Sequence, residues 1–289
     1  MAQDPPLSRV FDPRPATLGE GPLWHPKRGE LFWFDIIGKT LFGAHDSWIF
    51  DVHVSAAGWV DRETLLIASE RGLHRFDIAS GSLSDVIALE ADTRSTRSND
   101  GRADSWGGFW IGTMGKNAEK GAGAIYRYYQ GELRRLYAPL TIPNAICFSP
   151  DKNFAYFTDT PTRQIMRQRL NAADGWPDGT PELHIDLRAT GHYPDGAVVD
   201  VNGNLWCAIW GSARIACFDP TGVYRRHISF AAPHTSCPGF GGTDLSQLFC
   251  TTARMDLSAM ALKTYPHSGC VFVADSGTYG QAEYRVNLT

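Results

Sequence analysis

A repeated pair of short apolar segments is the feature that most restricts how this chain can fold. Six times along its 289 residues, an apolar run is followed by a turn rich in Gly, Asn or Asp and then by a second, more strongly apolar run. Residues 21–26 and 29–35 form the first pair, and residues 145–150 and 153–159 form the fourth. Equivalent positions in successive units lie 36 to 51 residues apart, about 44 on average: Glu20, Ala56, Asn99, Asn144, Asp195 and Gly239. A turn-type residue follows five positions later in every unit: His25, Asp61, Asp104, Ser149, Asp200 and Asp244.

A period of this length, with three or four short strands in each unit, is typical of the blades of a β-propeller. We therefore predict an all-β fold in which residues 1–289 form a single domain, a six-bladed β-propeller. A pair of β-sandwiches is the alternative, but it does not explain the regular spacing. We expect a terminal strand, either residues 7–11 or residues 282–288, to close the ring beside the last or the first blade.

Composition excludes several classes of protein. The net charge of −4, without a local cluster of Lys and Arg, argues against binding to nucleic acid. The start of the chain has neither a basic nor an apolar run, and no segment is long and apolar enough to cross a membrane, so we expect a cytoplasmic protein without a membrane partner. The six cysteines have no CxxC spacing, and we expect them to be reduced core residues.

The repeat also predicts where function lies. The first strand of each propeller blade lines the central channel, so the six equivalent positions should form a ring near one mouth. Taken singly, Glu20, Asn144 and Asp195 are typical turn residues, since each stands beside Gly or Pro. Together with Asn99 they would place two carboxylates and two amides in one channel, and buried charges are normally paired or bound to metal.

Oxygen ligands of this kind favour a hard divalent cation. We therefore predict a metal site in the central channel, with Ca²⁺ as the first choice and Mg²⁺ or Mn²⁺ as close alternatives. Zn²⁺ and Fe²⁺ are further alternatives, although the ring lacks the His or Cys ligands that these metals favour.

The same residues carry a resemblance to a known family. The segments that carry it are residues 18–24, 97–101, 109–114, 143–144, 193–196, 241–244 and 251–254. Through them the chain, from about Leu18 to its end, resembles the SMP-30/gluconolactonase/luciferin-regenerating-enzyme-like family of six-bladed propeller lactonases. The resemblance implies that Glu20, Asn144 and Asp195 bind the metal. It also implies that Asn99 meets the substrate or a metal-bound water, and that Arg97 contacts the substrate.

Three further residues are candidates for contact with a substrate. Glu119 lies in the Gly-rich segment 115–123, for which an acidic surface loop is the favoured interpretation; a lid over the mouth with Glu119 at the substrate is the alternative that makes it a candidate. His192 and His234 fall on loops near the expected mouth, but no histidine shows HxxxH or HExxH spacing. Since the chain also has no GxSxG segment, serine-type hydrolysis is disfavoured.

Together with these residues, the resemblance implies metal-dependent hydrolysis of a sugar lactone, an aldonolactone, to its sugar acid. The cation would polarise the lactone carbonyl, Arg97 and Asn99 would hold ring hydroxyls, and Asp195 would accept the proton from the attacking water. The polar ring, without an evident apolar funnel, is typical of a site for a polyhydroxylated small molecule. An ester or phosphotriester hydrolase and a non-catalytic calcium-binding propeller are the alternatives. We expect a monomer or a weak homodimer.

Overall fold

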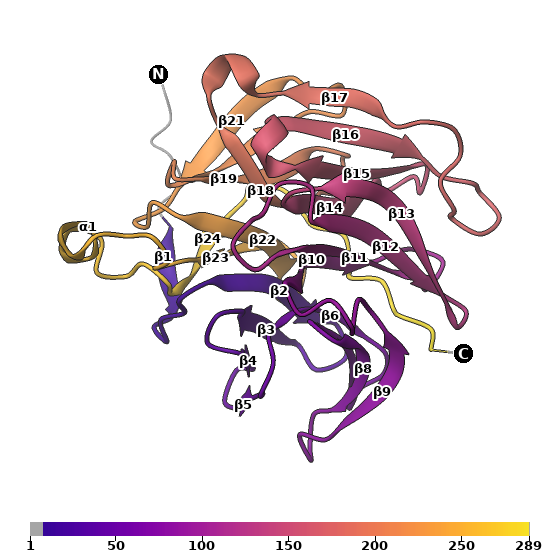
Figure 1. Ribbon diagram of the computed structural model, residues 1–289. Coiled ribbons are helices and arrows are strands. Elements are labelled where there is room, and N and C mark those ends of the chain that lie inside the picture. Colours follow the sequence, from indigo (N-terminus) through magenta and orange to yellow (C-terminus); the bar gives the residue numbers. More distant parts are fainter. Residues whose placement is uncertain (1–7, 289) are drawn as a thin grey trace.

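Six four-stranded antiparallel sheets make up the computed structural model, which describes residues 8–288 (Figure 1). From the channel outward, blade 1 consists of β2 (Gly19–His25), β3 (Glu30–Asp35), β4 (Thr40–Phe42) and β5 (Ser47–Ile49). Blade 2 consists of β6 (Val54–Trp59), β7 (Thr64–Ser69), β8 (Gly72–Asp77) and β9 (Leu83–Ala88). Blade 3 consists of β10 (Thr96–Ala103), β11 (Phe109–Gly115), β12 (Gly123–Tyr129) and β13 (Glu132–Leu140).

The second half of the chain repeats this arrangement. Blade 4 consists of β14 (Pro143–Phe148), β15 (Phe154–Asp159), β16 (Gln164–Arg169) and β17 (Glu182–Asp186). Blade 5 consists of β18 (Tyr193–Val199), β19 (Leu205–Trp210), β20 (Arg214–Phe218) and β21 (Tyr224–Ser229). Blade 6 consists of β22 (Thr235–Gly241), β23 (Gln247–Thr252), β24 (Val271–Asp275) and β1 (Arg9–Asp12). Each innermost strand contacts the innermost strands of both neighbouring blades, so β2, β6, β10, β14, β18 and β22 form a closed ring. The predicted six-bladed β-propeller is confirmed.

The ring is closed by the N-terminal strand. β1 pairs antiparallel with β24, with Arg9 opposite Val273, and so supplies the outermost strand of blade 6. This confirms the N-terminal choice, although Leu7 lies outside the described residues. The C-terminal choice is wrong, because residues 282–288 form no strand. They run past several blades instead, and the Val286 amide donates to the Trp59 carbonyl oxygen at 2.9 Å.

Helices contribute little to this fold. The two 3₁₀ turns η1 (Thr160–Thr162) and η2 (Arg188–Thr190) follow outer or middle strands, and α1 (Ala259–Thr264) lies between β23 and β24. The Ser258 hydroxyl caps α1 by accepting from the Ala261 amide. Among residues 8–288, no helix is both long enough and apolar enough to cross a membrane.

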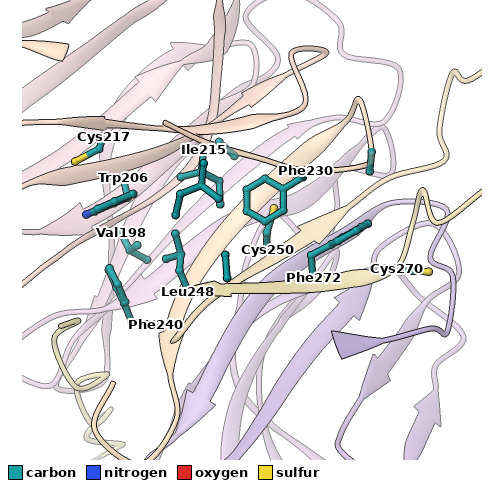
Figure 2. Close-up of a cluster of buried hydrophobic side chains, with 14 residues drawn as sticks. Val198, Trp206, Ile215, Cys217, Phe230, Phe240, Leu248, Cys250, Cys270 and Phe272 are labelled. Carbon is teal, nitrogen blue, oxygen red and sulfur yellow. The ribbon is translucent and has the colours of Figure 1, made fainter. Parts of the chain in front are cut away.

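Apolar side chains fill the spaces between neighbouring blades. Figure 2 shows the cluster between blades 5 and 6, which includes Trp206, Phe240, Leu248 and Phe272. Trp33, Trp110 and Trp206 are fully buried in three different clusters, as expected for side chains that contribute roughly 1.5–3 kcal/mol each when buried. All six cysteines are buried free thiols, which confirms their assignment to the core.

Each innermost strand carries a β-bulge near the ring of equivalent positions. In β2 the register shifts between Glu20 and Leu23, and in β14 it shifts between Asn144 and Cys147. The residues that follow two of the ring members, Glu20 and Asn144, have a left-handed backbone, with φ of 56° at Gly21 and 55° at Ala145. A non-glycine residue with this φ costs on the order of 1–3 kcal/mol, so the fold maintains strain beside Asn144. Bulges redirect side chains, and here they lie where the functional candidates leave the strand.

Candidate active site in the central channel

A cavity of about 450 Å³ opens at one mouth of the central channel. Its polar lining comes from blades 1, 3, 4 and 5 and from two loops: Glu20, Arg97, Asn99, Lys116, Asn117, Asn144, Thr160, Asp195 and Asp256. Its volume lies within the range that small-molecule sites usually have. Of the six predicted ring positions, Glu20, Asn99, Asn144 and Asp195 line the cavity together.

The other two ring positions do not reach the cavity. Ala56 is fully buried in the core cluster between blades 2 and 3. Gly239 pairs with Phe249, beyond the bulge that β22 makes between Thr235 and Cys237. The predicted alignment of blade 6 was therefore shifted along the strand, because sequence spacing does not reveal where the bulge lies.

Glu20 and Asp195 bring two carboxylates into a buried, mutually repulsive arrangement. Burial, followed by the nearby Asp100 charge, raises the pKa of Glu20 to about 8. The pKa of Asp195 is also raised, first by burial and then by the charge of Glu20. Arg97 partly offsets both effects, and burial lowers its own pKa to about 10. Without a further positive charge, this site therefore favours protonated carboxyl groups.

A chain of hydrogen bonds links the polar residues across three blades. Arg97 Nη1 donates to Asn99 Oδ1 at 2.8 Å, and Asn99 Nδ2 donates to Asn144 Oδ1 at 3.0 Å. Asn144 Nδ2 then donates to Thr160 Oγ1 at 3.0 Å, and Thr160 Oγ1 donates to the Pro194 carbonyl oxygen at 2.8 Å. Arg97 Nη1 also donates to the Ser98 carbonyl oxygen, and Asn99 Nδ2 also donates to the Pro143 carbonyl oxygen. The network therefore holds both amides in one orientation.

The orientation of Asn144 suits a cation. Since the Pro194 carbonyl can only accept, the Thr160 hydroxyl must donate to it and accept from the Asn144 amide nitrogen. Asn144 Oδ1 is thereby turned toward Asn99 and uses one of its two lone pairs there, which leaves the other for a ligand. Two carboxylates and an amide oxygen that line one cavity are a donor set that fits a hard divalent cation. Within residues 8–288, no group of three or more His, Cys, Asp or Glu side chains is placed to hold a metal ion, so the predicted metal site in the channel stays a prediction.

Arg97 reaches the cavity with part of its guanidinium group unpartnered. The side chain is 5% exposed, and its Nε atom is buried without a hydrogen-bond partner in the described part of the chain. Its Nη1 atom is held by the Ser98 carbonyl oxygen and by Asn99. A fixed, partly free guanidinium group at this position can donate to a hydroxyl or a carbonyl oxygen of a bound molecule.

Glu119 and the two loop histidines lie outside the cavity lining. Glu119 is exposed, and its carboxylate accepts from the Asn117 amide and from the Asn117 side chain, each at 3.0 Å. The residues before it, 116–118, do line the mouth, so the Gly-rich segment reaches the cavity with other side chains. Neither His192 nor His234 lines the cavity. The imidazole of His234 stacks on the indole of Trp210.

The mouth also has apolar side chains that sequence reasoning missed. They come from five blades or their loops: Leu18, Ile37, Met114, Ile142, Trp210 and Met255. The expectation of a polar site without an evident apolar funnel was wrong. Sequence reasoning missed these residues because they lie within or beside different strands and share no sequence spacing. Thr160 was missed for the same reason. The one sequence feature that could have indicated Thr160 is its position directly after Asp159, the last residue of β15.

The raised pKa values predict how stability depends on pH in the absence of divalent cations. The folded protein holds the Glu20 proton more tightly than the unfolded chain does. The contribution of this bound proton to the free energy of unfolding is therefore full below about pH 4.5 and is lost as pH rises through about 8. We expect the melting temperature of the metal-free protein to fall over this interval, and the fall to be smaller in Glu20→Gln. Equal slopes for both proteins in calorimetric scans would contradict the buried repulsion.

The fold and this cavity together define a class: a six-bladed propeller with an acidic, small-molecule-sized pocket at one mouth of its channel. The pattern of the SMP-30/Gluconolactonase/LRE-like region matches residues 18–254. The chain belongs to this family.

Similar proteins cover almost the entire chain. A Rhizobium meliloti protein, named as a candidate sugar lactone lactonase, is 38% identical over 286 residues, 97% of each chain. The L-arabinolactonase of Azospirillum brasilense is 33% identical and covers 93% of this chain and 92% of its own. A crystal structure of regucalcin from Agrobacterium tumefaciens, described as a calcium-binding protein, superposes with a TM-score of 0.95 at 37% identity, over 98% of both chains.

Proposed function

We propose that this protein is a lactone-hydrolysing enzyme that opens a sugar lactone to its acid with the help of one divalent cation. The observation that carries the proposal is the convergence of Glu20, Asn144 and Asp195 on one buried cavity, beside the partly free Arg97. Relatives named as lactonases, similar along more than nine-tenths of the chain, support the class of reaction.

Five polar residues of the cavity have a defined task in this reaction. A cation held by Glu20, Asn144 and Asp195 would act as a Lewis acid that stabilises negative charge on the lactone carbonyl oxygen. Arg97 donates to oxygen atoms of the substrate, and its bond to Asn99 fixes the direction of that donation. Asn99 orients Asn144 and faces the same cavity, where it contacts a ring hydroxyl.

Asp195 accepts the proton from the attacking water in this proposal. It lies on β18 in the bulged part of the strand, and its carboxylate is buried yet borders the cavity. The positive charge of a bound cation would counter the effect of burial and keep the carboxylate ionised at neutral pH. The tetrahedral adduct then collapses by breaking the ring C–O bond, and the proton passes to the ring oxygen, which becomes a hydroxyl.

Calcium is the cation that we propose. The ligand set consists of oxygen atoms alone, which Ca²⁺ prefers, and the regucalcin structure is described as that of a calcium-binding protein. Zn²⁺, Mn²⁺, Mg²⁺ and Fe²⁺ are the competitors in the test.

The proposal is tested by a pH-indicator assay with a panel of aldonolactones, together with a simple ester and a phosphotriester. We expect acid release from at least one aldonolactone with kcat/KM well above those for the ester and the phosphotriester. Preference for either competitor, or absence of turnover on the entire panel with each cation supplied, would refute it.

The hydrogen bonds of Thr160 lead to a prediction for the cation site. Thr160→Val keeps the shape of the side chain but cannot accept from Asn144, so the Asn144 amide loses its fixed orientation. We expect cation affinity in calorimetric titration to fall by about tenfold, as for loss of a residue that orients a ligand. Thr160→Ser should restore it. Equal affinity in Thr160→Val and the wild type would show that Asn144 needs no such support.

A further inference from the structure

Trp210 is the largest apolar side chain of the cavity and stands close to the proposed proton acceptor. It ends β19 and pairs with Tyr193 on β18, two residues before Asp195. The indole is partly exposed and lines the same cavity as Asp195. Its position on the adjacent strand places it on the mouth side of that carboxylate.

The indole is held in a fixed position by its surroundings. His234 stacks against it with ring centroids 4.2 Å apart and an angle of 17° between the planes. His234 Nδ1 lies 2.9 Å from the Met255 carbonyl oxygen, which holds the imidazole in turn. The indole also packs against the buried cluster of Leu18, Ile36 and Ala253. One face is therefore covered by His234, and the part that borders the cavity is available to a ligand.

A fixed aromatic ring beside a polar cavity wall matches the two-sided character of a sugar ring. Hydroxyl groups of such a ring project from its edges, whereas its C–H groups form an apolar face that packs against aromatic rings. Glu20, Arg97 and Asn99 supply polar partners from blades 1 and 3, and Trp210 supplies an apolar surface from blade 5, all in the same cavity. An open-chain ester lacks a fixed C–H face.

Resting on the proposed lactonase function, we propose that Trp210, supported by His234, is a specificity-determining platform that stacks on the C–H face of a cyclic sugar lactone. Stacking occurs before and during ring opening, so it lowers KM for cyclic substrates and leaves the chemistry of Asp195 unchanged. It thereby selects aldonolactones over open-chain esters of the same sugar acids.

The first test compares Trp210→Ala and Trp210→Phe by steady-state kinetics on an aldonolactone and on the open-chain methyl ester of the same acid. We expect KM for the lactone to rise about tenfold in Trp210→Ala, with kcat changed less than about threefold and KM for the ester unchanged. Trp210→Phe should retain most of the lactone preference. Trp24→Phe is the matched control, because Trp24 is also partly buried and stacked on an aromatic ring, Phe249, but lies outside the cavity lining.

A second test does not depend on turnover. A 1,5-anhydroalditol has the hydroxyls and the C–H face of a sugar ring but no carbonyl group. In saturation-transfer NMR with the wild type, we expect the C–H protons of one ring face to receive the strongest transfer, and this pattern to be lost in Trp210→Ala.

The two tests separate the platform from the proposed function. An unchanged lactone KM in Trp210→Ala, equal losses for lactone and ester, or the same NMR pattern without the indole would each overturn the platform, even if lactones are hydrolysed. If the wild type hydrolyses no lactone but the face-specific pattern depends on Trp210, the platform stands and the proposed function fails.

Discussion

Replacing Asp195 by asparagine is expected to reduce kcat/KM for the best aldonolactone by about a thousandfold, which lies within the range for loss of a positioned general base. If the substitution also removes a ligand of the cation, kcat/KM should fall further. The substitution keeps the shape of the side chain but removes both the proposed proton acceptor and one charge facing the cavity. Steady-state kinetics with saturating cation measure the effect.

The same variant should be more stable than the wild type when no cation is present. Asp195 and Glu20 are only 6% and 5% exposed, and the charge of Glu20 adds to burial in raising the pKa of Asp195. Removing one charge relieves that repulsion, so the melting temperature of metal-free Asp195→Asn should increase at pH 8. Asp92→Asn, a change of equal charge at an exposed position, is the control and should alter neither activity nor stability. Retention of turnover by Asp195→Asn would remove Asp195 from the mechanism.

Removing the divalent cation is expected to have the second large effect. Metal-free protein should hydrolyse aldonolactones at least about a hundredfold more slowly, because stabilisation of the carbonyl oxygen by a metal is worth several kcal/mol. Addition of one equivalent of Ca²⁺ should restore the rate, and competition with Zn²⁺, Mn²⁺, Mg²⁺ and Fe²⁺ identifies the most effective ion.

The fold must persist for this experiment to report on chemistry. The blades bury their cores independently of the cavity, with fully buried tryptophans between them, so far-UV circular dichroism should not change on chelation. Full turnover by protein shown to be metal-free by elemental analysis would refute the cation-dependent mechanism and leave Arg97 as the principal electrophilic group.

Most of the fold was predictable because strands and turns are local. The six units, their length of about 44 residues and the turn residues such as Asp104 and Asp200 are recognisable in the sequence. In the structure Asp104 Oδ1 accepts from the Trp106 and Gly108 amides, both at 2.9 Å, as a turn residue should. Closure was predictable only as a choice between two ends, since pairing of β1 with β24 joins segments about 260 residues apart.

The sequence by itself determined the number of blades and brought Glu20, Asn99, Asn144 and Asp195 to one mouth of the channel, because equivalent positions in a closed repeat occupy equivalent places. Only the tertiary structure decided that Gly239 falls outside the cavity, that Thr160 orients Asn144, and that Trp210 borders the polar wall. A β-bulge shifts the pairing register of a strand without a recognisable sequence pattern. Contacts between blades depend on the conformations of loops, which the repeat does not determine. The repeat therefore accounts for the four polar residues at the mouth, whereas β-bulges and contacts between blades decide which residues orient and flank them.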